Sequence, residues 1–98
     1  MILITGAIVA RPDTFEALLE LCIDHSRRSR GEPGCISHDV HIDGENPMRL
    51  VFIERWTDQA ALKAHFAVPD SGQFVVAARD LAAERTTMQV YEAELAKL

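Results

Sequence analysis

Three segments of this chain have the apolar spacing of β-strands. The first, Ile2–Val9, is almost continuously apolar, as in a strand covered on both faces, and Gly6 inside it indicates a bulge or a close backbone approach. Cys35–Ile42 and Thr86–Glu92 instead mix apolar and polar residues in alternation, which is typical of a strand with one buried face. In the Cys35–Ile42 strand, one predicted face carries Ile36, His38, Val40 and Ile42, and the other carries Cys35, Ser37, Asp39 and His41.

The stretch Arg49–Phe66 is predicted to join a fourth strand directly to a helix. Its first half, Arg49–Trp56, is β-branched and aromatic, and its second half, Asp58–Phe66, is rich in alanine and leucine. Thr57 lies between them and can cap the helix. One strand face carries Leu50, Phe52, Glu54 and Trp56. A carboxylate among aromatic side chains is unusual in a plain core, so this face indicates a pocket.

An earlier helix follows the first strand. Asp13 and Glu16 have the spacing of a capping box, the helix is expected to run to about Arg30, and Gly31 is the expected left-handed terminator. Its buried side is predicted to hold Phe15, Leu18, Leu19, Cys22 and Ser26.

The last helix is expected at about Gln73–Ala83, after a break at Pro69–Gly72. Its predicted buried residues are Phe74, Val75, Ala78 and Leu81. The resulting order, β-α-β-β-α-α-β, is that of a ferredoxin-like α+β fold with an antiparallel sheet and a second helix broken in two. We expect residues 1–98 to form a single domain of this kind.

A symmetric homodimer is predicted from the same pattern. Helices in this fold cover one face of the sheet, yet Ile2–Val9 and Leu50–Ile53 are apolar on both faces. A second copy of the sheet, packed face to face, would cover the remaining apolar surface, because a two-fold interface lets one patch cover itself.

Composition excludes several classes of function. The formal charge of −5 argues against a nucleic-acid surface, which usually has a basic excess. No stretch approaches the roughly 20 apolar residues of a membrane helix. The first residues lack the basic region of a signal peptide. The two cysteines form no CxxC pair. A cytoplasmic protein with no membrane partner is therefore expected. The histidines are scattered without zinc-site spacing, so no metal is expected.

Several short motifs together resemble one family. They are Glu32-Pro33-Gly34-Cys35, Asp39-Val40-His41, Glu54-Arg55-Trp56, Ala61-Leu62, Ala64-His65 and Pro69. The chain resembles the antibiotic biosynthesis monooxygenase (ABM) domain family of small dimeric ferredoxin-like proteins. The resemblance covers most of the chain in order, and it is more specific for fold than for reaction, because one fold hosts many activities.

The resemblance implies an oxygenase that converts phenols or quinols to quinones with O2 and without a cofactor. The family is also similar to haem-degrading enzymes and to an isomerase of a quorum-sensing sugar phosphate. Haem cleavage is disfavoured, because Ile2–Val9 lacks the asparagine that a haem-degrading relative would carry. Two positions depart from the family pattern: many relatives have tyrosine at His38 and a second histidine at Asp70.

Cofactor-free oxygenation needs a general base and a dry aromatic slot. His65 is the first choice of base, because histidine changes protonation near neutral pH and this one matches the family histidine. His38 is a candidate second acid/base group, and Glu54 could orient His65 or accept a substrate hydroxyl. The predicted substrate-binding residues are Trp56, Phe52, Phe66 and Phe74.

Each of these residues also has a structural interpretation. His65 could simply pack beside Phe66, Trp56 could be a large core residue, and Glu54 could pair with an arginine. His25 is interpreted as a helix-end cation, and His41 as pointing to the other sheet face, where it could serve the dimer. The alternative functions are an isomerase of a small carbonyl metabolite and a non-catalytic dimer that binds a hydrophobic metabolite.

Overall fold

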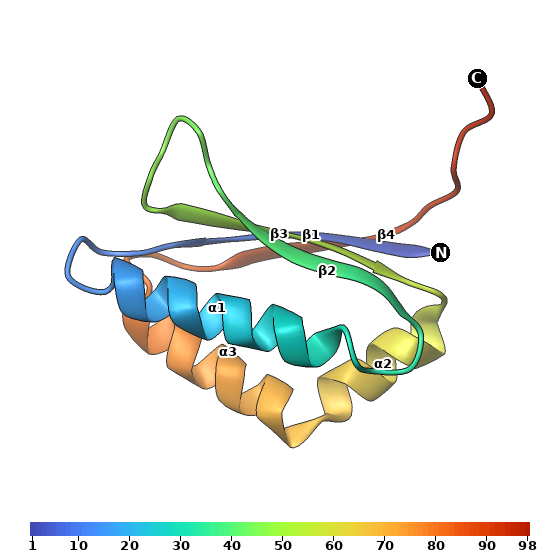
Figure 1. Ribbon diagram of the computed structural model, residues 1–98, viewed down its shortest axis with the longest axis horizontal. Coiled ribbons are helices and arrows are strands. Elements are labelled where there is room, and N and C mark those ends of the chain that lie inside the picture. The colour runs from blue at the N-terminus through green and yellow to red at the C-terminus, as the bar shows by residue number, and fades with distance from the viewer.

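The predicted strands pair into one antiparallel sheet in the computed structural model, which describes residues 1–98 (Figure 1). The elements are β1 (Ile2–Val9), α1 (Phe15–Ser29), β2 (Cys35–Ile42), β3 (Arg49–Trp56), α2 (Gln59–Ala67), α3 (Pro69–Leu81) and β4 (Thr87–Glu92). The strand order is β2-β3-β1-β4, which leaves the most apolar strands in the centre. This arrangement confirms the ferredoxin-like α+β fold.

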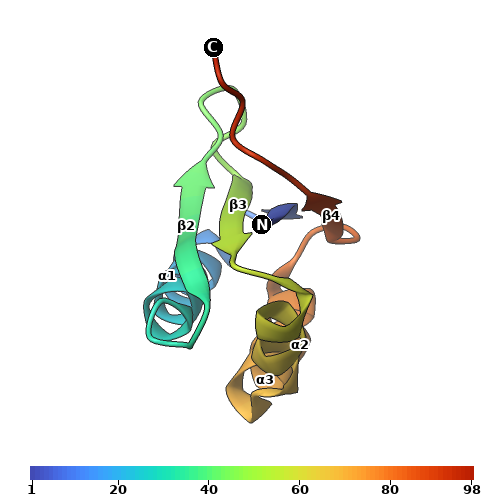
Figure 2. The same ribbon diagram turned by 90° about the vertical axis from the view of Figure 1, so that its right-hand side faces the viewer.

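All three helices lie on one side of the sheet (Figure 2). The opposite face carries half-buried apolar side chains from the central strands, including Leu3, Val51 and Ile53. Its packing against a second copy stays a prediction. None of the helices is both long enough and apolar enough to cross a lipid bilayer.

Two groups of buried apolar residues lie between the sheet and the helices. The apolar cluster consists of Ile8, Ala10, Leu18, Cys22, Leu50, Phe52 and Ala78. The tryptophan cluster consists of Ile2, Ile4, Trp56 and Leu62. Phe15, Leu19, Phe74 and Leu81 are only partly buried against the apolar cluster, and Val75, expected inside, is 42% exposed. Gly6 lets β4 approach closely, because a Cβ there would lie 3.1 Å from the Thr87 carbonyl oxygen.

The predicted helix caps are wrong in detail. Thr14, not Asp13, is the N-cap of α1, and its hydroxyl donates to the Leu81 carbonyl at 2.6 Å instead of capping the helix. Asp58, not Thr57, caps α2 and accepts from the Ala61 N–H at 2.8 Å. The Asp58 carboxylate, one residue nearer the first turn than Thr57, is therefore the group that caps the helix. Gly31 does not have a positive φ.

Two boundaries also differ from the prediction. The Pro69–Gly72 segment does not break the helix but forms the first turn of α3, where proline is tolerated at the start. In β2, a register shift between Cys35 and Ser37 interrupts the alternation. Cys35 therefore packs with the tryptophan cluster, on the same side as His38, while Ile36 is 54% exposed.

Candidate active site

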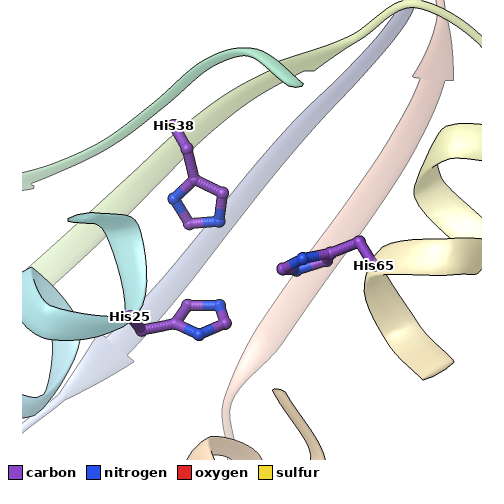
Figure 3. A group of neighbouring side chains, drawn as sticks. All are labelled: His25, His38 and His65. Atoms are coloured by element: carbon purple, nitrogen blue, oxygen red, sulfur yellow. The ribbon is translucent and has the colours of Figure 1, made fainter. Parts of the chain in front are cut away.

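Three histidines from three different elements meet under the helix-covered face of the sheet (Figure 3). His25 comes from α1, His38 from β2 and His65 from α2, and all three are buried. The ring centroid of His25 lies 5.1 Å from that of His38 and 5.3 Å from that of His65. The centroids of His38 and His65 are 5.7 Å apart. We call these three residues the histidine cluster.

His25 lies on the buried side of α1, at helical spacing from Leu18 and Cys22. Its ring stacks on Phe74, with centroids 3.9 Å apart and planes at 6°. Arg28 Nη2 lies 2.9 Å from His25 Nδ1, and because a guanidinium only donates, Nδ1 accepts and Nε2 carries the proton. Burial, together with His38, His65 and Arg28, lowers the pKa of His25 to about 3. The prediction of a helix-end cation is therefore wrong: this histidine is neutral.

His38 points inward, as its place in the strand pattern predicts, and it is fully buried. The register of β2 and β3 places it directly beside Glu54. Its Nδ1 lies 2.8 Å from the Ser26 hydroxyl. Its Nε2 lies 3.2 Å from Glu54 Oε1, but too obliquely for a hydrogen bond, so this nitrogen has no hydrogen-bond partner.

Glu54 is a buried carboxylate held by its neighbours. The Trp56 indole N–H donates to Glu54 Oε1 at 3.1 Å. Burial alone would raise the pKa of Glu54, but the adjacent His38, the Trp56 N–H and His65 outweigh it and lower the pKa below its usual value. Glu54 therefore remains ionised and places a negative charge beside the histidine cluster.

His65 is oriented by a second carboxylate. Its Nδ1 lies 2.8 Å from Glu32 Oε1, and because a carboxylate only accepts, Nδ1 carries a proton; in the neutral ring the lone pair is then on Nε2. Glu32 lies in the loop before β2, which passes close to α2 at Gly34. Gly34 has φ +82°, and a Cβ there would lie 2.5 Å from the Ala61 Cβ. The glycine thus permits the loop to bring Glu32 to His65.

A cleft of about 370 Å³ opens next to the histidine cluster. His25, Glu54 and His65 line it and are buried, whereas Phe66 at its wall is 49% exposed, so the polar groups lie at its inner end. Its apolar lining includes Ile4, Ile8, Phe52, Phe66, Phe74 and Met88. No lysine or arginine lines it. The size and lining suit a small, largely apolar ligand.

The structure brings most of the predicted site residues together. His65, Glu54, Phe52, Phe66 and Phe74 all line the cleft. Trp56 does not, although it was predicted to bind the substrate. It is fully buried, with its ring centroid 4.6 Å from that of His65. Its indole N–H donates to Glu54, so it contacts both residues without lining the cleft. His38 likewise lies behind the cleft and contacts it through Glu54. His41, expected on the other face, is exposed.

Four residues of this network were missed from the sequence: His25, Ser26 as a polar partner, Arg28 and Glu32. His25 left a signal, because it lies seven residues after Leu18 and three after Cys22, on the helix face predicted to be buried. Arg28 also left one, because it follows His25 at the i, i+3 spacing of helix neighbours. The roles of Ser26 and Glu32 depend on contacts across 12 and 33 residues, which no local pattern reveals.

The comparisons with known proteins agree with this architecture. Residues 1–77 match the model of a protein family described as antibiotic biosynthesis monooxygenase. This chain belongs to the ABM family. The match contains β1 through most of α3, and therefore all three residues of the histidine cluster together with Glu32 and Glu54.

Solved structures and a curated relative extend the comparison. The chain is similar to a candidate ABM protein from Deinococcus radiodurans, with 26% identity and a TM-score of 0.94 over 100% of this chain and 97% of that one. It is also similar to Rv0793 from Mycobacterium tuberculosis, with 25% identity and a TM-score of 0.89 over 98% and 96% of the two chains. The uncharacterized protein sll1783 from Synechocystis sp. is 34% identical over 91 residues, which cover 93% of this chain. This chain spans 62% of that relative's length.

The two positions predicted to depart from the family pattern, His38 and Asp70, lie within or beside this network. His38 contacts Glu54, and an Asp70 carboxylate oxygen lies 3.8 Å from Arg28 Nε. Arg28 in turn holds His25. His38 and Asp70 are therefore linked by a chain of contacts that runs through Glu54, the histidine cluster and Arg28.

Proposed function

We propose that this ABM-family protein is a small monooxygenase that oxidises a phenolic or quinol-type aromatic compound with O2 and without a bound cofactor. The observation that carries the proposal is His65, whose Nδ1–H is fixed by Glu32 and whose Nε2 lone pair is left free at the inner end of an apolar cleft. An oriented imidazole in a dry site is the arrangement that general-base catalysis requires.

The proposed reaction begins with proton transfer from the substrate to His65 Nε2. The resulting electron-rich anion gives one electron to O2, and the two radicals combine to form a C–O bond. The peroxide then loses water and leaves a carbonyl group. For a ring carbon that bears hydrogen opposite a phenol, the balance is phenol plus O2 to quinone plus water. His65 returns its proton to the departing oxygen.

The other lining residues are assigned supporting roles. Phe52, Phe66 and Phe74 offer ring surfaces for a flat substrate. Glu54, which is ionised, is placed to accept a hydrogen bond from a substrate hydroxyl. The absence of lysine and arginine from the cleft lining favours an uncharged aromatic compound over a phosphorylated one.

The test is O2 uptake by purified, metal-free protein against a panel of quinols and anthrones, with 18O2 used to trace the new carbonyl oxygen. We expect uptake and label incorporation for at least one flat aromatic substrate. The control is Lys63→Ala, which removes an exposed side chain of α2 outside both the cleft and the proposed dimer face and should behave like wild type. Binding of panel members without uptake would favour the non-catalytic alternative.

We also propose that the protein is a homodimer, with the uncovered sheet faces packed together. The support is the half-buried apolar side chains on the face without helices. Light scattering should give twice the chain mass of 10.9 kDa at micromolar concentration. A monomer mass would contradict this arrangement.

A further inference from the structure

The histidine cluster has a geometry that general-base catalysis alone does not require. One ring nitrogen from each of His25, His38 and His65 lies within 4.8 Å of the others, on three different elements. Three nitrogens bound to one zinc ion at about 2.0–2.1 Å lie about 3.3 Å apart, so the rings need to close by only about 1.5 Å. Figure 3 shows the three rings directed toward a common centre.

We propose that His25, His38 and His65 bind one divalent transition-metal ion of the Zn²⁺ class through their Nε2 atoms, with Glu54 beside it as a fourth ligand. This inference goes beyond the proposed function, which uses no metal. Neutral imidazole nitrogens with a carboxylate are a ligand set that Zn²⁺ accepts.

The Nδ1 contacts of His65 and His38 allow Nε2 to be the nitrogen that ligates, whereas Arg28 holds the proton on Nε2 of His25. Glu32 accepts from His65 Nδ1 at 2.8 Å, which is the carboxylate–histidine arrangement found behind many metal ligands. Ser26 contacts His38 Nδ1 at 2.8 Å, and because a hydroxyl can accept, it permits the tautomer with a free Nε2 lone pair. His38 Nε2 is buried, and its polar neighbour is Glu54 Oε1 at 3.2 Å, in poor geometry for a hydrogen bond. A bound ion would lie between this nitrogen and that carboxylate and be contacted by both.

Charge and access also fit a divalent cation. Glu54 contributes one carboxylate 3.2 Å from His38 Nε2, and Glu32 contributes a second behind His65. Together they offset the positive charge of Arg28. His25, His65 and Glu54 line the cleft, which provides the path by which an ion enters.

Arg28 is the one group that opposes the ion. It donates to His25 Nδ1 and so places the proton on the Nε2 that must ligate. Asp70, 3.8 Å from Arg28 Nε, offers the guanidinium another partner when His25 turns. Removing the guanidinium should therefore tighten binding by about tenfold or more, because a hydrogen bond to a charged group no longer holds the wrong tautomer.

A metal at this site would occupy the lone pair of His65 that the proposed reaction uses as its base. Zn²⁺ should consequently inhibit oxygenation. The metal site and the oxygenase reaction remain separable, because metal binding is measured without substrate and O2 uptake without metal.

The experiment is calorimetric titration of tag-free, metal-free protein with Zn²⁺, together with visible absorption of the Co²⁺ form to report coordination number. We expect one ion per chain and a four-coordinate Co²⁺ spectrum. His25→Ala, His38→Ala and His65→Ala should each lose at least tenfold in affinity, and His41→Ala should bind like wild type. Absence of stoichiometric binding in the wild type, or equal binding by all four variants, would overturn the proposal.

A further variant guards against loss of folding in the alanine series. Arg28→Met keeps all three histidines and should bind Zn²⁺ more tightly than wild type. Unchanged or weaker binding by a folded Arg28→Met protein would also count against the site.

Discussion

The two ends of the helix-covered sheet face are built on different principles. Toward the α1–α3 contact lies the apolar cluster, where Leu18, Cys22 and Leu50 are completely buried among hydrocarbon neighbours. Toward α2 lies the histidine cluster, where buried imidazoles and carboxylates replace hydrocarbon. All three buried side-chain atoms without hydrogen-bond partners, on Arg28, Glu32 and His38, belong to this second region.

This difference shows which region stabilises the fold and which is available for chemistry. Burial of apolar surface is the main favourable term in folding, whereas buried polar atoms without partners are costly. The histidine region therefore lowers stability relative to an apolar core of equal size. Its persistence on three separate elements is consistent with a functional site, where such costs are usually concentrated.

The largest expected effect is on turnover, in the histidine region. His65→Gln removes the base but can keep a hydrogen bond to Glu32, so turnover should fall about 10²–10⁴-fold with a small change in melting temperature. Steady-state O2 uptake paired with thermal melts measures both. Full turnover in the variant would show that His65 is not the base.

The second prediction concerns the apolar cluster. Leu18→Ala should lower the free energy of unfolding by about 2–5 kcal/mol, because a fully buried leucine leaves a cavity. Turnover per folded molecule should stay near the wild-type value. A loss of activity without a loss of stability would mean that the two regions are not separate.

The third prediction uses pH to separate the regions. The pKa of His25 is lowered from 6.5 to about 3, so between these values the unfolded chain binds a proton that the folded chain does not. Stability should therefore fall as pH drops through this window. Glu54, with its lowered pKa, contributes stability above the usual glutamate pKa and loses it on acidification, in the same direction.

Urea titrations from pH 7 to pH 4 measure this slope. His25→Phe keeps an aromatic ring against Phe74 but cannot titrate, so its stability should depend less steeply on pH than that of wild type. Leu18→Ala should keep the wild-type slope. Equal slopes in wild type and His25→Phe would contradict the account.

The smallest expected effect concerns the loop that carries Glu32. Gly34→Ala should destabilise by about 1–3 kcal/mol, because φ is +82° and the new Cβ would meet the Ala61 Cβ. Gly72→Ala, whose Cβ meets nothing within 4 Å in helix α3, should be neutral or stabilising by up to about 1 kcal/mol. Chemical denaturation of both variants distinguishes them.

The sequence predicted the fold because strand and helix periodicities are local. It also predicted the cleft face of β3, since Phe52 and Glu54 alternate within one strand. It missed His25 and Glu32, because their contacts with His38 and His65 arise only when α1, β2 and α2 pack together. The caps at Thr14 and Asp58 were missed because neighbouring polar residues compete for one position and their choice depends on tertiary contacts.

The most direct test of the account is substrate deprotonation in the absence of O2. An anthrone or quinol bound to metal-free protein should show the absorption of its anion at neutral pH, since His65 Nε2 takes the proton before any oxygen chemistry. His65→Gln should bind the same compound in its neutral form. A neutral ligand in the wild-type cleft, or equal amounts of anion in both proteins, would contradict the assignment of His65 as the base.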